Sequence, residues 1–496
     1  MQKKYILAID QGTSSTKTIL FDELGQPFAR GTVPLKTHYL NNGFVEQDPE
    51  DIYNNVLQSV QQCLKEFISK GGVLTDIKTA GISNQRETFV LWNKNGQPLY
   101  RAVVWQCKRS LAICEAWKKA GYQERVHAKT GLLIDPYFSG SKLAWLYQHN
   151  ESVKTAVDEG NAFFGTVDTW LLYKLTAGKS YYTDYTNASR TLLFNLHSLQ
   201  WDEELLETFQ LSKLRLPELK PSSADFGSTN FDGLLPGKIT ITGMIGDSHA
   251  AAFGEGCFTP GSAKATMGTG CSILMNIGAA PVDSKNGMVT TICWSTEDIV
   301  NYALEGVIVT CGATIEWLKN ELGLFTDSSN TEAMANAVPD NGGVFLIPAF
   351  SGLGAPYWDM NRKASIVGLG FGTNKNHITR AALESIAFQV MDVVKAMQAD
   401  TNIPLQQLMA DGGITSNRFV MQLLADLLKT PVVNIGHADV SALGAAYMAG
   451  LKSGIYTSIE QLKEFNTKQT VIQPGIHKPA LQHYNTWAAV IAGNQY

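Results

Sequence analysis

The sequence predicts an α/β protein of two domains that are built as related halves. Two segments have the same pattern of strand, Gly/Ser/Thr turn and strand: residues 6–21, near the N-terminus, and residues 263–275, which open the second half. The chain has 496 residues, 44% of them hydrophobic, which is enough for two sizeable cores. We therefore expect an N-terminal domain over residues 1–250 and a C-terminal domain over residues 251–496.

The first turn has a composition that suits phosphate. It reads DQGTSSTK at residues 10–17. Gly12 lets the backbone approach an anion closely, and the hydroxyl and N–H groups that follow it are phosphate donors. Asp10, at the end of the first strand, is suited to Mg²⁺, usually through water. An ordinary polar hairpin is the alternative interpretation, and this segment alone does not decide between the two.

Two later glycine-rich turns favour the phosphate interpretation. Residues 266–272 read TMGTGCS between two apolar runs, and residues 408–417 read LMADGGITSN. The second pattern predicts a strand, a turn and a helix start, with Ser416 or Asn417 as the N-cap. Together the three turns indicate a nucleotide held between two halves. A P-loop kinase and a dinucleotide fold are disfavoured, because neither glycine signature stands in its expected context.

Composition argues against several other classes. The net charge of −5 and the pI of about 6.0 imply no polybasic face, so nucleic acid is a poor candidate partner. No apolar run reaches 18 residues and no signal-peptide pattern is present, so no membrane insertion is expected. The seven cysteines show no Cys-x-x-Cys spacing. We interpret them as reduced thiols of a cytoplasmic protein without a zinc site.

The order of the remaining elements follows an α/β pattern. Asp48 and the proline and acids after it predict a helix start, and Gly71-Gly72 predicts its end. The small residues of the last predicted helix would let it pack very closely on a sheet. The predicted elements are a helix at 49–69, strands at 77–83, 88–92 and 239–243, a helix that opens at 246–252, and helices at 110–119, 377–397 and 441–449.

A polar segment, NQRET at residues 84–88, follows one buried strand directly. It belongs in a loop at the carboxyl end of that strand, where α/β sheets bind ligands. Arg86 donates hydrogen bonds and Glu87 accepts them, which suits a polyhydroxylated substrate. The alternative for this adjacent pair is a surface ion pair, worth about 0–1 kcal/mol.

Three further side chains are candidates for the same site. Trp105 is able to stack on an apolar ligand face, although a core tryptophan has the same pattern. Tyr137 offers a hydroxyl near a turn. Asp247 follows a strand and Gly246 and precedes a helix, so its carboxylate either accepts a proton from a substrate hydroxyl or only caps the helix.

Taken together, these segments closely resemble the FGGY carbohydrate kinases, and within them the glycerol kinases, over nearly the whole chain. Residues 137–149 and 364–384 fit the two family signatures. The strongest matches are DQGT at 10, NQRET at 84, WQC at 105, DPYFSG at 135, TDYTNASRT at 183, GTG at 268 and FSGLGAPYW at 350. The resemblance implies a two-domain actin/ribonuclease-H-like ATPase fold with an interdomain cleft, and family members are often homodimers or homotetramers.

The resemblance also implies an activity and a set of site residues. It implies an ATP-dependent kinase that phosphorylates a terminal hydroxyl of a small polyol, first glycerol to sn-glycerol 3-phosphate, with Asp247 as the general base. The acceptor would contact Arg86, Glu87, Trp105, Tyr137, Asp247 and Ser248. ATP would contact Thr13, Ser14, Ser15, Lys17, Thr269, Gly312, Glu316, Gly413 and Asn417, and Mg²⁺ would lie at Asp10 and Asp247.

The chain departs from the glycerol kinase pattern at three of these positions and at Ser272. Ser248 stands where a glutamine amide is usual, and Ser272 where an aromatic ring is usual. Both changes either remove a contact to glycerol or open room for a longer polyol or a ketose, and this alternative stays open. Lys17 replaces a usual Arg, and Glu316 a usual Gln. A non-metabolic actin-like ATPase would share the phosphate turns, but it would not need the acceptor residues.

Overall fold

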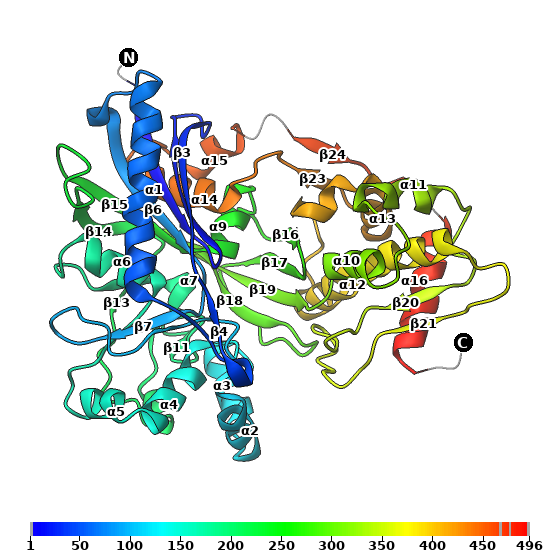
Figure 1. Ribbon diagram of the computed structural model, residues 1–496, viewed down its shortest axis with the longest axis horizontal. Coiled ribbons are helices and arrows are strands. Elements are labelled where there is room, and N and C mark those ends of the chain that lie inside the picture. The colour runs from blue at the N-terminus through cyan, green and yellow to red at the C-terminus, as the bar shows by residue number, and fades with distance from the viewer. Residues whose placement is uncertain (1–2, 466–468, 476–477, 494–496) are drawn as a thin grey trace.

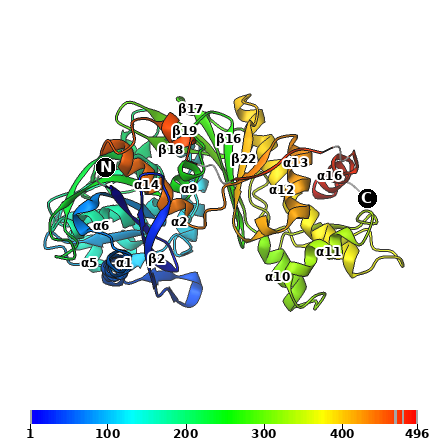
Figure 2. The same cartoon turned by 90° about the horizontal axis from the view of Figure 1, so that it is seen from above.

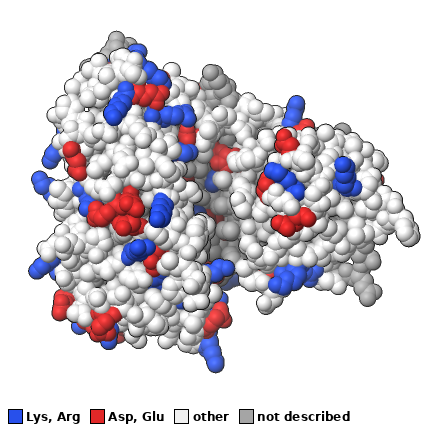
Figure 3. Space-filling view, viewed as in Figure 1, with Lys and Arg blue, Asp and Glu red and all other residues white. Residues whose placement is uncertain are grey.

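The computed structural model describes residues 3–465, 469–475 and 478–493, which form two lobes. The first half of the chain builds one lobe and most of the second half builds the other (Figure 1). The space-filling view shows a furrow between the two lobes (Figure 3). None of the helices among the described residues is both long and apolar enough to span a membrane.

A mixed six-stranded sheet forms the centre of the first lobe. Its strand order is β14-β15-β6-β1-β2-β3, with β1 antiparallel to β2 and parallel to β6. Its inner strands are buried on both faces, which explains why they are near-continuous apolar runs in the sequence. The strands are β1 (Tyr5–Gln11), β2 (Ser15–Phe21), β3 (Pro27–Pro34), β6 (Ile77–Asn84), β14 (Ser223–Thr229) and β15 (Ile239–Gly246).

The second lobe contains a seven-stranded sheet of the order β18-β19-β17-β16-β22-β23-β24. Its strand β16 pairs antiparallel with β17 on one side and parallel with β22 on the other, as β1 does with β2 and β6. This shared topology supports the predicted duplication. The strands are β16 (Ser262–Met267), β17 (Cys271–Gly278), β18 (Val289–Ser295), β19 (Val300–Ile308), β22 (Gln407–Asp411), β23 (Val432–Asn434) and β24 (Thr470–Ile472).

Two helices, α9 (Asp247–Gly254) and α14 (Val440–Lys452), lie between the two sheets (Figure 2). The close packing predicted for the small-residue helix is present. A Cβ on Gly81 of β6 would lie 2.3 Å from the carbonyl oxygen of Ala445, and one on Gly444 would lie 1.8 Å from that of Ala250. Helix α14 comes from the second half but packs on the sheet of the first, so a boundary near residue 250 stays a prediction.

The remaining elements cover these sheets. Helix α1 (Pro49–Ser69) has the predicted bounds, and Asp48 caps it by accepting a hydrogen bond from the backbone N–H of Glu50. A small sheet in the first lobe contains β4 (His38–Tyr39), β5 (Val45–Gln47), β8 (Ala102–Val103), β7 (Phe89–Trp92) and β9 (Phe163–Thr166). The other elements of this lobe are α2 (Leu111–Lys119), α3 (Gln123–Thr130), α4 (Ser139–His149), α5 (Glu151–Asp158), α6 (Val167–Leu175), α7 (Tyr185–Ala188), α8 (Glu203–Thr208), and the short strands β10 (Tyr182–Asp184), β11 (Phe194–Asn195), β12 (Gln200–Trp201) and β13 (Glu218–Lys220).

The second lobe is helical outside its sheet. Helix α12 extends the predicted 377–397 helix by a few residues at each end. The elements are α10 (Gly312–Asn320), α11 (Thr331–Asn336), α12 (Lys375–Thr401), α13 (Arg418–Leu428), α15 (Ile459–Lys463), α16 (Lys478–Ile491), the strands β20 (Phe345–Ile347) and β21 (Ser365–Val367), and the 3₁₀ turns η3 (Ser328–Asn330) and η4 (Gly413–Ser416).

Candidate active site

Arg86 and Glu87 lie in the loop after β6, as the sequence predicts, but both side chains are buried. The surface ion-pair interpretation is therefore wrong, and each side chain has a different partner. The Nε of Arg86 donates to Asp247 at 3.1 Å, while Glu87 accepts from the Nε of Arg190 at 2.6 Å. Glu87 has a φ of 60°, a left-handed conformation that costs a non-glycine residue about 1–2 kcal/mol.

Two fully buried side chains complete an ion network that the site prediction does not include. Glu305 of β19 lies 2.9 Å from Nη1 of Arg86 and 2.7 Å from Nη1 of Arg190. Burial opposes the charge on Glu305, but the two guanidinium groups outweigh it and hold the pKa of the carboxyl below its usual range. A glutamate inside the apolar run YALEGVIV is the sequence signal for this residue, because an unpaired charge there would be very costly.

Asp247 is the first residue of α9, and the N-cap is Gly246. The helix-cap interpretation of Asp247 is therefore wrong. Its carboxylate is the most open member of the network, with 37% of the side chain exposed. Asp10 lies at the end of β1 close to Asp247. Burial, and then the Asp247 carboxylate, raise the pKa of Asp10 to about 6. Asp10 and Asp247 are therefore neighbouring carboxylates, and a Mg²⁺ site at this pair stays a prediction.

Trp105 and Tyr137 form an aromatic corner beside this network. Their rings meet edge to face with centroids 5.6 Å apart, and both side chains are half-buried. The indole Nε1 of Trp105 donates to Oγ1 of Thr13 at 2.9 Å. The loop that carries Tyr137 is held by Lys142, whose buried ammonium donates to the carbonyls of Pro136 and Tyr137. The corner therefore joins the acceptor residues to the first phosphate hairpin.

Ser248 and Ser272 both lie at this site. Ser248 follows Asp247 on α9, and its backbone N–H donates to Oδ1 of Asp247 at 2.6 Å. Ser272 of β17 donates through its hydroxyl to Oε1 of Glu305 at 3.2 Å. Both serine side chains are half-buried. Because Arg86 contacts the same oxygen of Glu305, Ser272 lies beside the candidate acceptor residues.

A separate pocket of about 570 Å³ lies in the second lobe. The β16–β17 turn, the start of α10, and η3 and η4 line it. Among its lining residues are all five candidate nucleotide residues of the second half: Thr269, Gly312, Glu316, Gly413 and Asn417. Asn417 is the N-cap of α13, one of the two caps that the sequence predicts, and its amide also donates to Thr331. One of the two N–H donors of the Asn417 amide is therefore used within the protein.

The candidate nucleotide residues of the first half form the β1–β2 turn. Thr13 and Ser15 are half-buried and Ser14 is exposed, and Oγ1 of Thr13 already accepts the hydrogen bond from Trp105. Lys17 of β2 forms an ion pair with Asp439, just before α14, at 2.9 Å. The charge of Lys17 is therefore already paired with a carboxylate of the protein.

Comparison with known proteins decides the family. A model of the N-terminal domain of the FGGY family of carbohydrate kinases matches residues 5–254, and a model of the C-terminal domain of that family matches residues 263–453. The chain belongs to the FGGY carbohydrate kinases. Its fold is therefore the two-domain actin/ribonuclease-H-like ATPase fold that the resemblance implies.

Several relatives of this FGGY kinase are named glycerol kinase. The glycerol kinase of Carboxydothermus hydrogenoformans is 46% identical over 463 residues, 93% of this chain and 92% of that protein. Glycerol kinase 2 of Thermotoga maritima is 43% identical over 99% of this chain and 98% of its own. The crystal structure of Plasmodium falciparum glycerol kinase with ADP superposes with a TM-score of 0.94 at 35% identity, covering 100% of this chain and 99% of that one.

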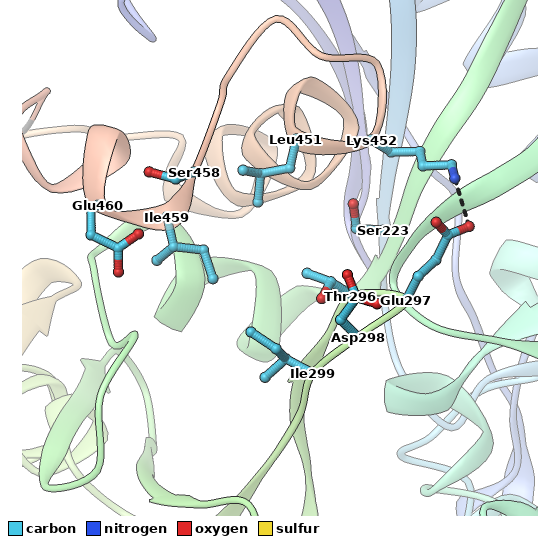
Figure 4. A pocket seen from close by; sticks show the side chains of 10 residues that line it. All are labelled: Ser223, Thr296, Glu297, Asp298, Ile299, Leu451, Lys452, Ser458, Ile459 and Glu460. Carbon is cyan, nitrogen blue, oxygen red and sulfur yellow. Dashed lines mark hydrogen bonds and ion pairs between the residues drawn. The ribbon is translucent and has the colours of Figure 1, made fainter.

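A second pocket of the kinase lies away from these residues (Figure 4). It is formed by the β18–β19 turn, the end of α14 and the start of α15. Lys452 and Glu297 form an ion pair across it at 2.6 Å. None of the candidate site residues lines this pocket, so we assign it no part in the reaction.

One glycine sets the shape of the nucleotide pocket. Gly412 has a φ of 92°, and a Cβ there would lie 2.5 Å from the carbonyl oxygen of Met267. We expect Gly412→Ala to push η4 away from β16 and to raise the KM for ATP at least tenfold, because η4 forms one wall of the pocket. Steady-state kinetics and the ADP-induced shift in Tm measure this effect.

Gly454→Ala is the matched control for this substitution. Gly454 has a φ of 71°, but no atom lies within 4 Å of the Cβ position. The control should lose stability from backbone strain alone and keep the KM for ATP. Equal effects of the two variants on that KM would contradict the role given to Gly412.

Proposed function

We propose that this FGGY kinase transfers the γ-phosphoryl group of ATP to a terminal hydroxyl of glycerol. The observation that carries the proposal is the hydrogen bond from Trp105 to Thr13, because it joins a candidate acceptor residue directly to the first phosphate hairpin. The names of the 43–47% identical relatives support glycerol as the acceptor. The pocket of the second lobe, lined by the candidate nucleotide residues, supports a site for ATP there.

The residues of the site have distinct roles in the proposed reaction. The acceptor hydroxyl attacks the γ-phosphorus, ADP leaves, and the carboxylate of Asp247 takes the hydroxyl proton. Arg86 and Glu87 hold the other hydroxyls, and the Trp105–Tyr137 corner packs on the carbon chain. Phosphoryl transfer has a loose transition state, so positioning and charge neutralisation contribute more than the base alone. Closure of the two lobes would exclude water as a competing acceptor.

Asp10 and Asp247 fit a magnesium ion that also binds the phosphates of ATP. Mg²⁺ is commonly held by one or two carboxylates, water and substrate phosphates rather than by a complete protein cage. When bound, the ion would neutralise charge on the transferring phosphate.

The raised pKa of Asp10 predicts a pH-dependent effect on stability. Because the folded-state pKa is about 6 and the unfolded value is about 4, ionisation of Asp10 costs stability as the pH rises through this window. We expect Asp10→Asn to increase the free energy of unfolding by roughly 2–3 kcal/mol at pH 8 and to leave it unchanged at pH 4. Urea unfolding at both pH values, without Mg²⁺, measures this difference.

The same variant should be nearly inactive, because it removes a carboxylate from the proposed metal pair. Asp158→Asn is the control, since Asp158 accepts a hydrogen bond from Tyr147 on the surface of the first lobe. A stabilisation of Asp10→Asn that is equal at pH 4 and pH 8 would show that the Asp10 charge is not the cause.

A longer polyol or a ketose is the second candidate acceptor. The observation that favours it is the hydroxyl of Ser272, which adds a small polar group to the wall formed by Glu305 and Arg86. An acceptor with one or two more hydroxyl groups would find a hydrogen-bond partner there. A hydroxyl that finds such a partner contributes about 1 kcal/mol.

ADP release against a panel of acceptors tests the proposed function. The panel consists of glycerol, erythritol, threitol, xylitol, ribitol, xylulose and gluconate, with a reaction that lacks any acceptor. The highest kcat/KM on glycerol supports the first candidate, and the highest value on a longer acceptor supports the second. ADP release at the same rate without acceptor would overturn the kinase proposal in favour of an actin-like ATPase.

Two further features belong to this proposal. We propose a cytoplasmic location, which the cysteines support, because all seven are free thiols and buried.

The oligomeric state stays a prediction of a homodimer or homotetramer, and size-exclusion chromatography with light scattering measures it.

A further inference from the structure

Glu305 is a residue of the C-terminal FGGY domain that lies among the candidate acceptor residues of the N-terminal domain. It lies on β19, inside the C-terminal match at residues 263–453, whereas Arg86, Glu87 and Arg190 lie inside the N-terminal match at residues 5–254. Its side chain is fully buried. Oε1 faces Arg86 and Ser272, and Oε2 faces Arg190. One carboxylate therefore contacts three groups, two of them from the other domain.

We propose that Glu305 is a positioning residue that orients the Arg86 guanidinium toward the acceptor. The proposal rests on the proposed function, because it assigns Arg86 to the acceptor. Glu305 does not itself contact the reacting atoms. It acts by holding one nitrogen of Arg86, so that the rest of the guanidinium group faces the substrate.

The geometry of Arg86 supports this role. Its Nε donates to Asp247 and its Nη1 contacts Glu305, on a planar fork whose donors have fixed directions. The hydrogen bond from Nε sets the direction of the fork, and the ion pair of Nη1 with Glu305, which lacks hydrogen-bond geometry, holds its other end by charge. Nη2 forms no hydrogen bond to protein within the described residues and is the donor left for an acceptor hydroxyl.

The charges of the network also support it. Without the carboxylate of Glu305, Asp247 would be the one ion-pair partner left to Arg86 among the described residues, with the Glu87 carboxylate as a further anion nearby. The guanidinium would then turn toward Asp247 and pair with it through two nitrogens. Its Nη2 would no longer point at the acceptor hydroxyl. Arg190 would keep Glu87 as a partner, so the loss would fall mainly on Arg86.

The test substitutes Glu305→Gln, which keeps the size of the side chain and removes its charge. We expect the KM for the acceptor to rise at least tenfold and the KM for ATP to stay within twofold, because Glu305 does not line the nucleotide pocket. In thermal unfolding, the Tm shift induced by glycerol should be lost while the shift induced by ADP is kept. Glu305→Asp retains the charge on a shorter stem and should give an intermediate acceptor KM.

Glu384→Gln is the matched control. Glu384 is also buried and also pairs with an arginine, Arg380, at 2.9 Å, but on α12 outside the acceptor site. It should lose stability to a similar extent and keep the acceptor KM. An acceptor KM of Glu305→Gln within twofold of the wild type, or an equal rise in Glu384→Gln, would overturn the proposal.

Two further outcomes are distinguishable. If the wild-type protein shows no acceptor-dependent ADP release with any member of the panel, the proposed function fails and this inference fails with it. If the best acceptor is a longer polyol, the same measurements are made with that compound. If Glu305→Gln also loses the ADP-induced shift in Tm, the variant is misfolded and Glu305→Asp is used in its place. A folded Glu305→Asp with a wild-type acceptor KM would contradict the positioning role.

Discussion

Asp247→Asn should lower kcat at least a thousandfold with glycerol as the acceptor. The substitution removes the proposed base, which by itself contributes a factor of about 10²–10⁴, and it also removes one carboxylate of the pair with Asp10. Arg86 would lose the anion that holds its Nε. Acceptor-dependent ADP release at saturating substrates measures the effect.

Binding measurements separate lost chemistry from lost structure in this variant. Asp247 does not line the nucleotide pocket, so the ADP-induced shift in Tm should persist. Asp158→Asn, on α5 of the first lobe, should keep both kcat and the shift. A kcat within tenfold of the wild type in Asp247→Asn would show that another group takes the proton.

Arg190→Met should be the most destabilising single substitution in the site. Arg190 is fully buried, pairs with both Glu87 and Glu305, and lies over the Phe138 ring at 5.0 Å. Removing one partner of a buried ion pair leaves an uncompensated charge and costs about 3–5 kcal/mol of unfolding free energy. Urea unfolding gives the size of the loss.

The pH dependence of this loss tests its electrostatic origin. The pKa of Glu87 is already raised by burial, against the opposing effect of Arg190 and Arg86. Without Arg190 that pKa rises further, so the deficit of Arg190→Met relative to the wild type should shrink as the pH is lowered from 8 and Glu87 takes up a proton.

Arg125→Met is the control, because it makes the same substitution at a surface arginine. Arg125 pairs with Glu204 at 2.9 Å on the surface, where both side chains are at least 40% exposed. Its loss should cost only about 0–1 kcal/mol at either pH. Similar costs for the two arginines would contradict the importance given to burial of the network.

Local patterns were sufficient to predict the elements that bind phosphate. The two hairpins, the cap and bounds of α1, and the Asn417 cap follow from apolar runs, glycine positions and short-range hydrogen bonds. These signals lie within a few residues of one another, so no knowledge of distant contacts is needed.

Interactions between distant residues were not predictable in the same way. Arg86 and Glu87 are neighbours that suggest an ion pair, yet their partners lie more than 100 residues away at Asp247 and Arg190. Lys17 lies in a phosphate-like turn but pairs with Asp439. A charged side chain takes the partner that the folded chain brings closest, and sequence spacing does not contain that information.

The sequence alone determined the family, the two-lobed α/β fold and the candidate residues of the site, because strand runs, turn glycines and family motifs are local properties. Only the tertiary structure decided how those residues are used. It buried the Arg86–Glu87 loop, placed Asp247 inside α9 rather than at its cap, and brought Glu305 from the second domain into the site. The physical reason is that a buried charge is tolerated only when the whole fold supplies its counter-charge.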